Sequence, residues 1–274
     1  MNPDQHIAEH YTRGMLEETI LRALQNAGRN TDQLSSADLA PLDNLHLGGR
    51  EAVEELSGFM ALRPGMHLLD VGSGVGGPAR YFAEHGCDVT GIDLTEEFVL
   101  TAESLTRKLN LDGKAKFRQG SALEMPFASG TFDGGYMIHV GMNIEDKPRL
   151  FREVARVLKP GARFAIFDIM RVGDHPLEFP VPWATQPHTS FVATVEEYRY
   201  ALAAAGLRVE HVRDRRQVSI EFMEKMRAQA AAGAREILGV HLLMGEHAPL
   251  MLKNVNGAIY AGKLVPVELV AIAG

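Results

Sequence analysis

The fold follows from one stretch of the chain, Leu68-Leu69-Asp70-Val71-Gly72-Ser73-Gly74-Val75-Gly76-Gly77, in which an apolar run enters a glycine-rich turn. Glycine permits a tight turn and lets a ligand lie directly against the backbone. By its letters the turn also satisfies the G-x-G-x-x-G pattern of NAD and FAD sites, through Gly72, Gly74 and Gly77. That pattern alone does not distinguish a dinucleotide from another nucleoside-like ligand.

Two carboxylates separate these interpretations. Asp70 stands two residues before the first glycine, where its charge disfavours a pyrophosphate at the helix N-terminus. A phosphate-free cofactor with a cationic sulfonium and an ammonium group suits this carboxylate better. Asp93 ends the next predicted strand, close to the spacing of about 20 residues expected for a ribose-binding acid. Its two oxygens can accept hydrogen bonds from both ribose hydroxyls.

On both sides of this loop the sequence predicts strands that alternate with helices. The expected strands are 67–71, 88–92, 115–119, 132–139, 163–168, 207–212 and 264–272. The expected helices between the first five strands are 78–84, a helix that follows Thr95, and one that ends before Lys159-Pro160-Gly161. This alternation predicts an α/β fold, a seven-stranded and mostly parallel sheet with helices on both faces.

The flanking segments predict a cap and a lid. Leu16, Ile20 and Leu24 have helical spacing, 30–49 has the composition of a loop, and a second amphipathic helix follows around Leu56. We therefore expect an N-terminal helical cap over 1–62 and a ligand-binding domain over 63–274. Within that domain, 170–190 contains four prolines and has no periodicity, which is typical of a lid or a binding loop.

Composition limits the partners and the compartment. The chain has 274 residues and a formal net charge of −7, which disfavours nucleic acid and anionic membranes as partners. We expect its basic cluster to be a solvated edge; the cluster comprises Arg208, Arg213, Arg215 and Arg216. The single cysteine, Cys87, favours a reducing compartment. The first residues do not resemble a signal peptide, and no apolar stretch approaches the roughly 20 residues that span a bilayer, so we expect a cytoplasmic location.

His6 and His10 have a metal-binding spacing but no third ligand nearby, so no metal is expected.

The residues from Asp70 to Gly76 match the D-x-G-x-G-x-G motif of class I methyltransferases, and further segments resemble this family in order. These are Gly91-Ile92-Asp93-Leu94, Gln119-Gly120-Ser121-Ala122, Phe132-Asp133 and Leu158-Lys159-Pro160-Gly161. The resemblance implies a Rossmann-like sheet with an antiparallel final hairpin, and S-adenosyl-L-methionine as cofactor. The cofactor-binding residues that it implies are Asp70, Gly72, Ser73, Gly74, Gly76, Asp93, Leu94, Ser121, Ala122 and His139. The family often has Asp where this chain has Ser121, whose hydroxyl can still accept from the adenine amino group.

The flanks resemble narrower groups. The residues 43–49 and 179–184 are similar to segments of sarcosine and dimethylglycine methyltransferases, and the ubiquinone, menaquinone and sterol C-methyltransferases resemble the core. The candidate substrate-binding residues are Tyr11, His46, Asn143 and Trp183. The face of Trp183 can stabilise an ammonium group, although a packed lid residue explains it equally well. His139, after the fourth strand, is the candidate base, with a purely structural role as the alternative.

The sequence thus predicts methyl transfer to a small molecule, with N-methylation of a small amine such as a glycine derivative as the favoured reaction. C-methylation of a quinone- or sterol-like ring is the alternative, and it would need a base. A nucleotide-binding module without catalysis is the alternative of another class, and Asp70 disfavours an NAD-dependent oxidoreductase. A homodimer stays open.

Overall fold

A computed structural model describes residues 8–12, 14–43, 46–233 and 238–274. Within them, seven strands form one sheet in the order β3-β2-β1-β4-β5-β7-β6. The strands are β1 (His67–Val71), β2 (Asp88–Asp93), β3 (Ala115–Gln119), β4 (Phe132–Ile138), β5 (Leu158–Arg171), β6 (Leu207–Asp214) and β7 (Leu264–Ala273). The first five strands are parallel, and β7 is antiparallel to both β5 and β6. The predicted sheet and its antiparallel end are confirmed.

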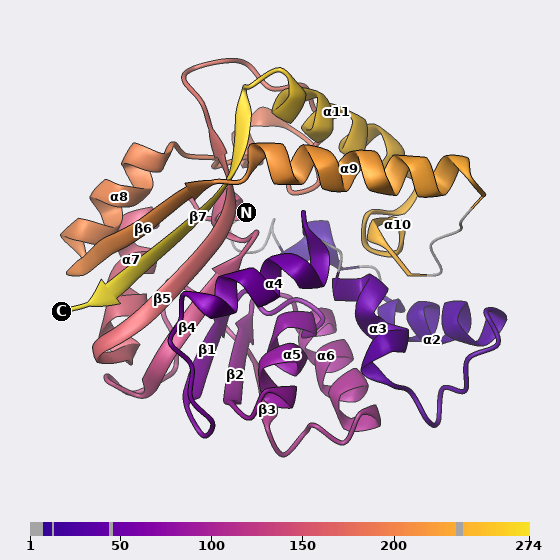
Figure 1. The fold of residues 1–274 in the computed structure, drawn as a ribbon, viewed down its shortest axis with the longest axis horizontal. Coiled ribbons are helices and arrows are strands. Elements are labelled where there is room, and N and C mark those ends of the chain that lie inside the picture. Colours follow the sequence, from indigo (N-terminus) through magenta and orange to yellow (C-terminus); the bar gives the residue numbers. More distant parts are fainter. Residues whose placement is uncertain (1–7, 13, 44–45, 234–237) are drawn as a thin grey trace.

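Helices cover both faces of this sheet (Figure 1). They are α2 (Leu16–Asn26), α3 (Ser36–Asp43), α4 (Gly49–Gly58), α5 (Gly77–Glu84), α6 (Glu96–Lys108), α7 (Lys147–Val157), α8 (Val195–Ala204), α9 (Arg216–Ala231), α10 (Val240–Met244) and α11 (Ala248–Tyr260). The described part of the chain also contains the short 3-10 turns η1 (Gly141–Asn143), η2 (Pro187–Thr189) and η3 (Gly245–His247). In Figure 1, α9 and α11 lie next to each other, and α2, α3 and α10 lie together at the right of the view.

The apolar side chains divide into a core on each face. One core joins the sheet to α7 and α8, through Phe151, Val154 and Leu202. The other joins it to α4, α5 and α6, through residues such as Leu56 and Phe82. Because both faces are covered, the central strands read as nearly continuous apolar runs in the sequence.

The cap helices form a third cluster above the glycine loop. The side chains of Leu16, Ile20 and Leu24 from α2 pack with Phe98 of α6 and Leu243 of α10. The prediction of α2 is confirmed. The prediction of a loop over 30–49 is wrong in part, since α3 occupies Ser36–Asp43 and buries Leu39 and Leu42. Pro41 inside α3 and its lack of an amphipathic period conceal this helix in the sequence.

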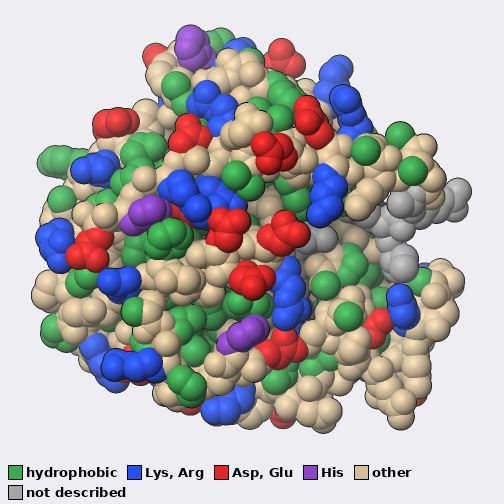
Figure 2. Space-filling view, viewed as in Figure 1, with side chains coloured by type: hydrophobic (Ala, Val, Ile, Leu, Met, Phe, Trp, Pro, Cys, Tyr) green, Lys and Arg blue, Asp and Glu red, His purple; other side chains and the backbone are tan. Residues whose placement is uncertain are grey.

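The predicted solvated edge is wrong for Arg215, whose side chain is only 3% exposed. Arg213 and Arg215 both form ion pairs with Glu268 of β7, at 2.7 and 3.3 Å, and with Glu55 of α4. Glu268 is fully buried, so this cluster ties a cap helix to the antiparallel end of the sheet. Elsewhere, on the face seen in Figure 2, acidic and basic side chains are interspersed over the surface.

The strand order reverses at β1, because β2 follows it on one side and β4 lies on the other. In open α/β sheets such a switch point leaves a crevice beyond the carboxyl ends of the strands, and ligands bind there. The glycine loop, the end of β2 and the end of β4 all meet at this point.

Candidate active site

A cavity of about 580 Å³ lies at the switch point. The carboxyl edge of the sheet supplies one wall, which includes Asp70, Asp93 and His139. The opposite wall comes from distant segments, namely the cap, the chain after β5 and α10. These segments contribute Tyr11, Leu42, His46, Pro182, Trp183, Leu243 and Met244.

The glycine loop is shaped by positive φ angles. Gly72 has φ +71°, and a Cβ at this position would overlap the Val140 side chain. The amides of Gly72 and Ser73 donate to the Ile92 carbonyl at 2.8 and 3.1 Å, which ties the loop to the end of β2. Gly76 does not line the cavity; a Cβ there would approach Phe117 to 2.7 Å, so this glycine permits close packing.

The carboxylate of Asp93 binds backbone amides of the glycine loop and of the turn after β2. One carboxylate oxygen accepts from the Gly74 amide at 2.8 Å and the other from the Thr95 amide at 2.9 Å. Burial raises the pKa of Asp93, and these backbone hydrogen bonds oppose the shift. A carboxylate offers about four lone-pair positions, so each oxygen can accept one further hydrogen bond.

Two buried polar atoms beside the loop lack partners within the described residues. They are Oγ of Ser73 and Oδ2 of Asp70, which has only a poorly placed Tyr136 hydroxyl beside it, and both Ser73 and Asp70 line the cavity. Burial also raises the pKa of Asp70 to about 8. Buried polar groups are normally hydrogen-bonded, so these atoms are suited to a polar, positively charged ligand.

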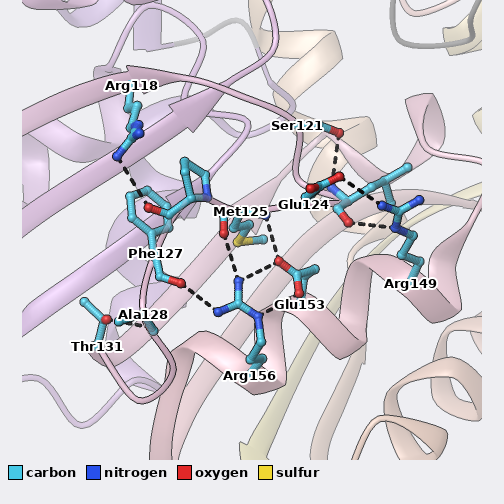
Figure 3. A network of polar contacts seen from close by, with 12 residues as sticks. Arg118, Ser121, Glu124, Met125, Phe127, Ala128, Thr131, Arg149, Glu153 and Arg156 are labelled. Atoms are coloured by element: carbon cyan, nitrogen blue, oxygen red, sulfur yellow. Dashed lines mark hydrogen bonds and ion pairs between the residues drawn. The ribbon is translucent and has the colours of Figure 1, made fainter.

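The turn that follows β3 is fixed by α7 (Figure 3). Arg156 donates to the carbonyls of Met125 and Phe127 at 2.8 and 2.6 Å, and Glu153 accepts from the Met125 amide at 2.7 Å. Arg149 donates to the Leu123 carbonyl at 2.8 Å. These contacts define the 121–127 turn, which presents Ser121 and Ala122 to the cavity. Ser121 Oγ accepts from the Leu123 amide at 3.2 Å.

The side chains predicted on the substrate side come from three separate segments of the cavity wall. Tyr11 donates to the side-chain oxygen of Asn143 at 3.2 Å, and burial raises the pKa of the Tyr11 hydroxyl. A ring nitrogen of His10 lies 3.1 Å from the Pro182 carbonyl, so the cap touches the 170–190 segment. Trp183 is buried, and its indole N–H donates to Ser190 at 2.9 Å.

A buried carboxylate supports η1 from behind. Asp168 of β5 accepts from the Gly141 amide at 2.8 Å and from the Tyr198 hydroxyl at 2.7 Å. Any side chain at Gly141 would overlap these two partners, so glycine is required there. The Phe191 amide donates to the Met142 carbonyl of η1 at 2.9 Å, and Lys147 at the start of α7 donates to the Phe191 carbonyl at 2.8 Å, so η1 and α7 are both joined to the chain just after the lid-like segment. The sequence reading missed this support, because Asp168, Gly141 and Tyr198 come together only in the folded chain.

Apart from Gly76, every residue predicted for the site lines the same cavity. Leu42 and Phe98 also line the cavity and were not predicted from the sequence, because they carry no chemical signature of their own. Among the described residues, no three His, Cys, Asp or Glu side chains are placed to hold a metal ion. In that same part of the chain, no helix is long and apolar enough to cross a membrane.

Comparison with known proteins defines the class. Residues 69–166 match the family model described as Methyltransferase domain, so this part of the chain is a methyltransferase domain. The sterol 24-C-methyltransferase erg6 of Schizosaccharomyces pombe is 35% identical over 122 residues, which are 44% of this chain and 32% of that protein. The match therefore spans about a third of the length of that relative.

Solved structures share the fold over nearly the whole chain. A protein described as a sarcosine dimethylglycine methyltransferase from Galdieria sulphuraria superposes with a TM-score of 0.69 at 21% identity, over 85% of this chain and 93% of that one. The geranyl diphosphate C-methyltransferase from Streptomyces coelicolor A3(2), in complex with Mg²⁺, geranyl diphosphate and S-adenosyl-L-homocysteine, superposes with a TM-score of 0.72 at 18% identity. That superposition covers 100% of this chain and 98% of the other. The predicted methyltransferase fold is confirmed.

Proposed function

We propose that this protein transfers a methyl group from S-adenosyl-L-methionine to a small molecule. One observation carries the proposal: Asp93 is fixed beneath the glycine loop at the strand-order switch point, with free acceptor capacity toward a cavity of about 580 Å³. The methyltransferase domain over 69–166 and the S-adenosyl-L-homocysteine bound by a protein of the same fold support it.

The residues of the sheet edge suit this cofactor. Asp93 can accept from the ribose hydroxyls, and Ser121 and Ala122 present the 121–127 turn to an adenine. Asp70 and Ser73 bring their unpartnered atoms to the polar end of the ligand. The bound cofactor supplies an activated methyl group, and the protein contributes alignment and the exclusion of water.

The identity of the methyl acceptor remains a prediction from the sequence. N-methylation of an amine such as a glycine derivative is the sequence-based expectation, and Trp183 at the cavity wall is compatible with it. C-methylation of a ring is the alternative, with His139 as base. A cytoplasmic location, the lack of nucleic-acid or membrane partners, and dimerisation also stay predictions.

The proposal is tested by calorimetry with two ligands. S-adenosyl-L-homocysteine is expected to bind the purified chain with one site, and NADH is expected not to bind, because Asp70 stands where a pyrophosphate would lie. Binding of NADH without binding of S-adenosyl-L-homocysteine would overturn the methyltransferase proposal.

We further propose that the cap and the 170–190 segment act as a lid, because both line the cavity and they touch each other through His10 and the Pro182 carbonyl. Glu97 of α6 accepts from the amides of Gly14 and Leu16 at 3.0 and 2.8 Å and thereby fixes the start of α2. Lids of this kind close on binding and exclude water. S-adenosyl-L-homocysteine is therefore expected to slow limited proteolysis within 8–27 and 172–190.

The variant Glu97→Ala is expected to speed cleavage before α2, because two amides at the helix start lose their acceptor. Glu96→Ala is the matched control, since the neighbouring side chain is exposed in the same helical turn. The lid proposal is contradicted if S-adenosyl-L-homocysteine does not change the rate of proteolysis in either segment and Glu97→Ala and Glu96→Ala are cleaved at the same rate. The cap would then be a fixed wall of the cavity.

A further inference from the structure

Two histidines stand next to each other in the cavity wall. His139 follows the last residue of β4, and His46 precedes α4 in the cap. Their ring centroids are 5.9 Å apart, and both rings contact Phe167 edgewise or tilted. The pair therefore spans the boundary between the sheet edge, where the cofactor is proposed to bind, and the cap.

Ring nitrogens of both histidines lack hydrogen-bond partners within the described residues. These are Nδ1 and Nε2 of His46 and Nε2 of His139, and all three atoms are buried. The buried Nε2 of His211 also lacks a partner, but that ring stacks on Phe59 and does not line the cavity. His67, in contrast, lies 2.8 Å from the Thr90 hydroxyl. A buried polar atom without a partner is costly, which indicates that these nitrogens are reserved for a ligand. His46 belongs to the cap, so opening of the lid would uncover them.

The backbone of His139 supports the same interpretation. Its φ angle is +55°, a left-handed conformation that is uncommon outside glycine, although histidine, asparagine and aspartate adopt it more often than other residues. The His139 amide donates to the Phe167 carbonyl at 2.7 Å, which holds the residue in this conformation. Strained backbone of this kind clusters at functional sites, because it aims a side chain that a regular strand would aim elsewhere.

Both rings are uncharged at neutral pH. Burial lowers the pKa of His46 to about 4. Burial also lowers the pKa of His139 well below its usual value, and the neighbouring His46 lowers it further. A neutral imidazole carries one donor and one acceptor nitrogen, so the pair can both donate to and accept from the same hydroxyl group.

The segments that surround the histidine pair contribute mostly uncharged side chains. The cap, η1, the segment after β5 and α10 contribute only apolar or neutral polar side chains, with Met142, Trp183 and Met244 among them. Among the described lining residues, Arg149 carries the only cationic side chain besides histidine, and it is bound to the 121–127 turn. A carboxylate or phosphate on the acceptor would therefore lack a cation here, while the carboxylates that line the cavity on this side, Glu145 and Asp146, follow η1 and lie apart from the histidine pair in sequence. Burial of an unpaired charge is strongly unfavourable.

We propose that the methyl acceptor is an uncharged, predominantly apolar molecule that presents a hydroxyl group to His46 and His139, and that the methyl group is transferred to this oxygen. This inference rests on the proposed methyltransferase function and names its substrate class. His46 binds and orients the hydroxyl group, and His139 accepts its proton.

The step balances without a further reactant. A lone pair of the hydroxyl oxygen forms the bond to the methyl carbon, the electron pair of the carbon–sulfur bond returns to sulfur, and the hydroxyl proton passes to Nε2 of His139. An oxygen that gains a methyl group while it still holds a proton becomes far more acidic than an imidazolium, so a ring of low basicity suffices. The ring then releases the proton to water as the product leaves.

The test uses matched acceptors of three sizes. Phenol, 2-naphthol and 4-phenylphenol are each compared with the amine and the carboxylic acid on the same ring system, and N,N-dimethylglycine is added to the panel. Methyl transfer is followed with methyl-labelled S-adenosyl-L-methionine. At least one hydroxyl compound is expected to be methylated on oxygen, at least tenfold faster than the amine and the acid of the same size.

Variants separate the two roles. His139→Gln is expected to lower kcat for the accepted hydroxyl compound about 100-fold, at the lower end of the usual gain from general-base catalysis. His46→Gln is expected to raise KM about tenfold with a smaller effect on kcat, because it loses a ground-state contact. His85→Gln is the control, since His85 is exposed at the far end of α5.

The affinity for S-adenosyl-L-homocysteine is measured for every variant and is expected to change less than twofold for His46→Gln and His85→Gln; for His139→Gln, whose residue also belongs to the cofactor wall, kcat is compared at saturating S-adenosyl-L-methionine. The inference is overturned if the amine, the acid or dimethylglycine is the preferred acceptor, if no hydroxyl compound is methylated, or if neither histidine variant alters kcat or KM. Failure of S-adenosyl-L-homocysteine to bind the unmodified protein contradicts the methyltransferase proposal instead, so the two failures are distinguishable.

Discussion

Replacement of Asp93 with alanine is expected to weaken the binding of S-adenosyl-L-homocysteine by about 1.5–3 kcal/mol, which is roughly one to two orders of magnitude in Kd. The carboxylate is expected to accept from the ribose hydroxyls, and it already accepts from the amides of Gly74 and Thr95. Its loss therefore removes both the ligand contacts and the brace beneath the glycine loop. Calorimetry measures the change directly.

Two comparisons isolate the ribose contact from the brace. An analogue of S-adenosyl-L-homocysteine without ribose hydroxyls is expected to suffer a much smaller penalty from Asp93→Ala, because it never formed those hydrogen bonds. Asp88→Ala, at the other end of β2, changes an exposed carboxylate paired with Lys114 and is expected to leave the affinity unchanged. An equal penalty for both ligands would assign Asp93 to loop structure alone.

Removal of the Glu268 carboxylate is expected to lower the free energy of unfolding by about 3 kcal/mol. Glu268 is fully buried, and the Glu268→Ala variant leaves the buried Arg215 and the neighbouring Arg213 with Glu55 as their remaining partner. The free-energy penalty of a buried charge without a partner is larger than the favourable energy that the intact ion pair contributes. Denaturant unfolding, followed by circular dichroism, gives the difference.

Glu210→Ala is the matched control on the adjacent strand. Glu210 pairs with Arg163 and Arg208 at a partly exposed site, where an ion pair contributes about 0–1 kcal/mol. A similar cost for both variants would mean that the Glu268 cluster behaves as a surface ion pair despite its burial. Glu268→Gln keeps the side-chain volume and shows how much of the cost arises from charge.

The sequence predicted the sheet well because its signals are local. The run that ends at Asp70 and Gly72 and the segment that ends at Asp93 are apolar stretches stopped by chain-turning or polar residues, and β1 was predicted with its exact bounds. For β5 the predicted range 163–168 was too short, since the strand extends from Leu158 to Arg171. Pairing with β7 along this length is a tertiary effect that no local pattern reports.

The candidate site divides in the same way. The cofactor-binding side was predictable, because its residues lie in a loop and at three strand ends within one continuous stretch of the chain. The acceptor side combines Leu42, Trp183 and Met244, which are far apart in sequence and individually resemble ordinary core residues. The burial of Arg215 escaped prediction for a related reason, because its partners Glu55 and Glu268 come from distant elements.

The attachment of the 121–127 turn to α7 makes the two parts a single cooperative unit. The Met125 amide donates to the Glu153 carboxylate and not to a neighbouring strand, so this amide becomes exchangeable with solvent only when the helix side chain withdraws. Arg156, one turn further along the helix, grips the same turn through two carbonyls. Local opening of the nucleoside end of the cavity therefore requires partial release of α7. A ligand bound at this end of the cavity therefore makes local unfolding of α7 less favourable. The effect reaches the far end of the helix, which lies well outside the cavity.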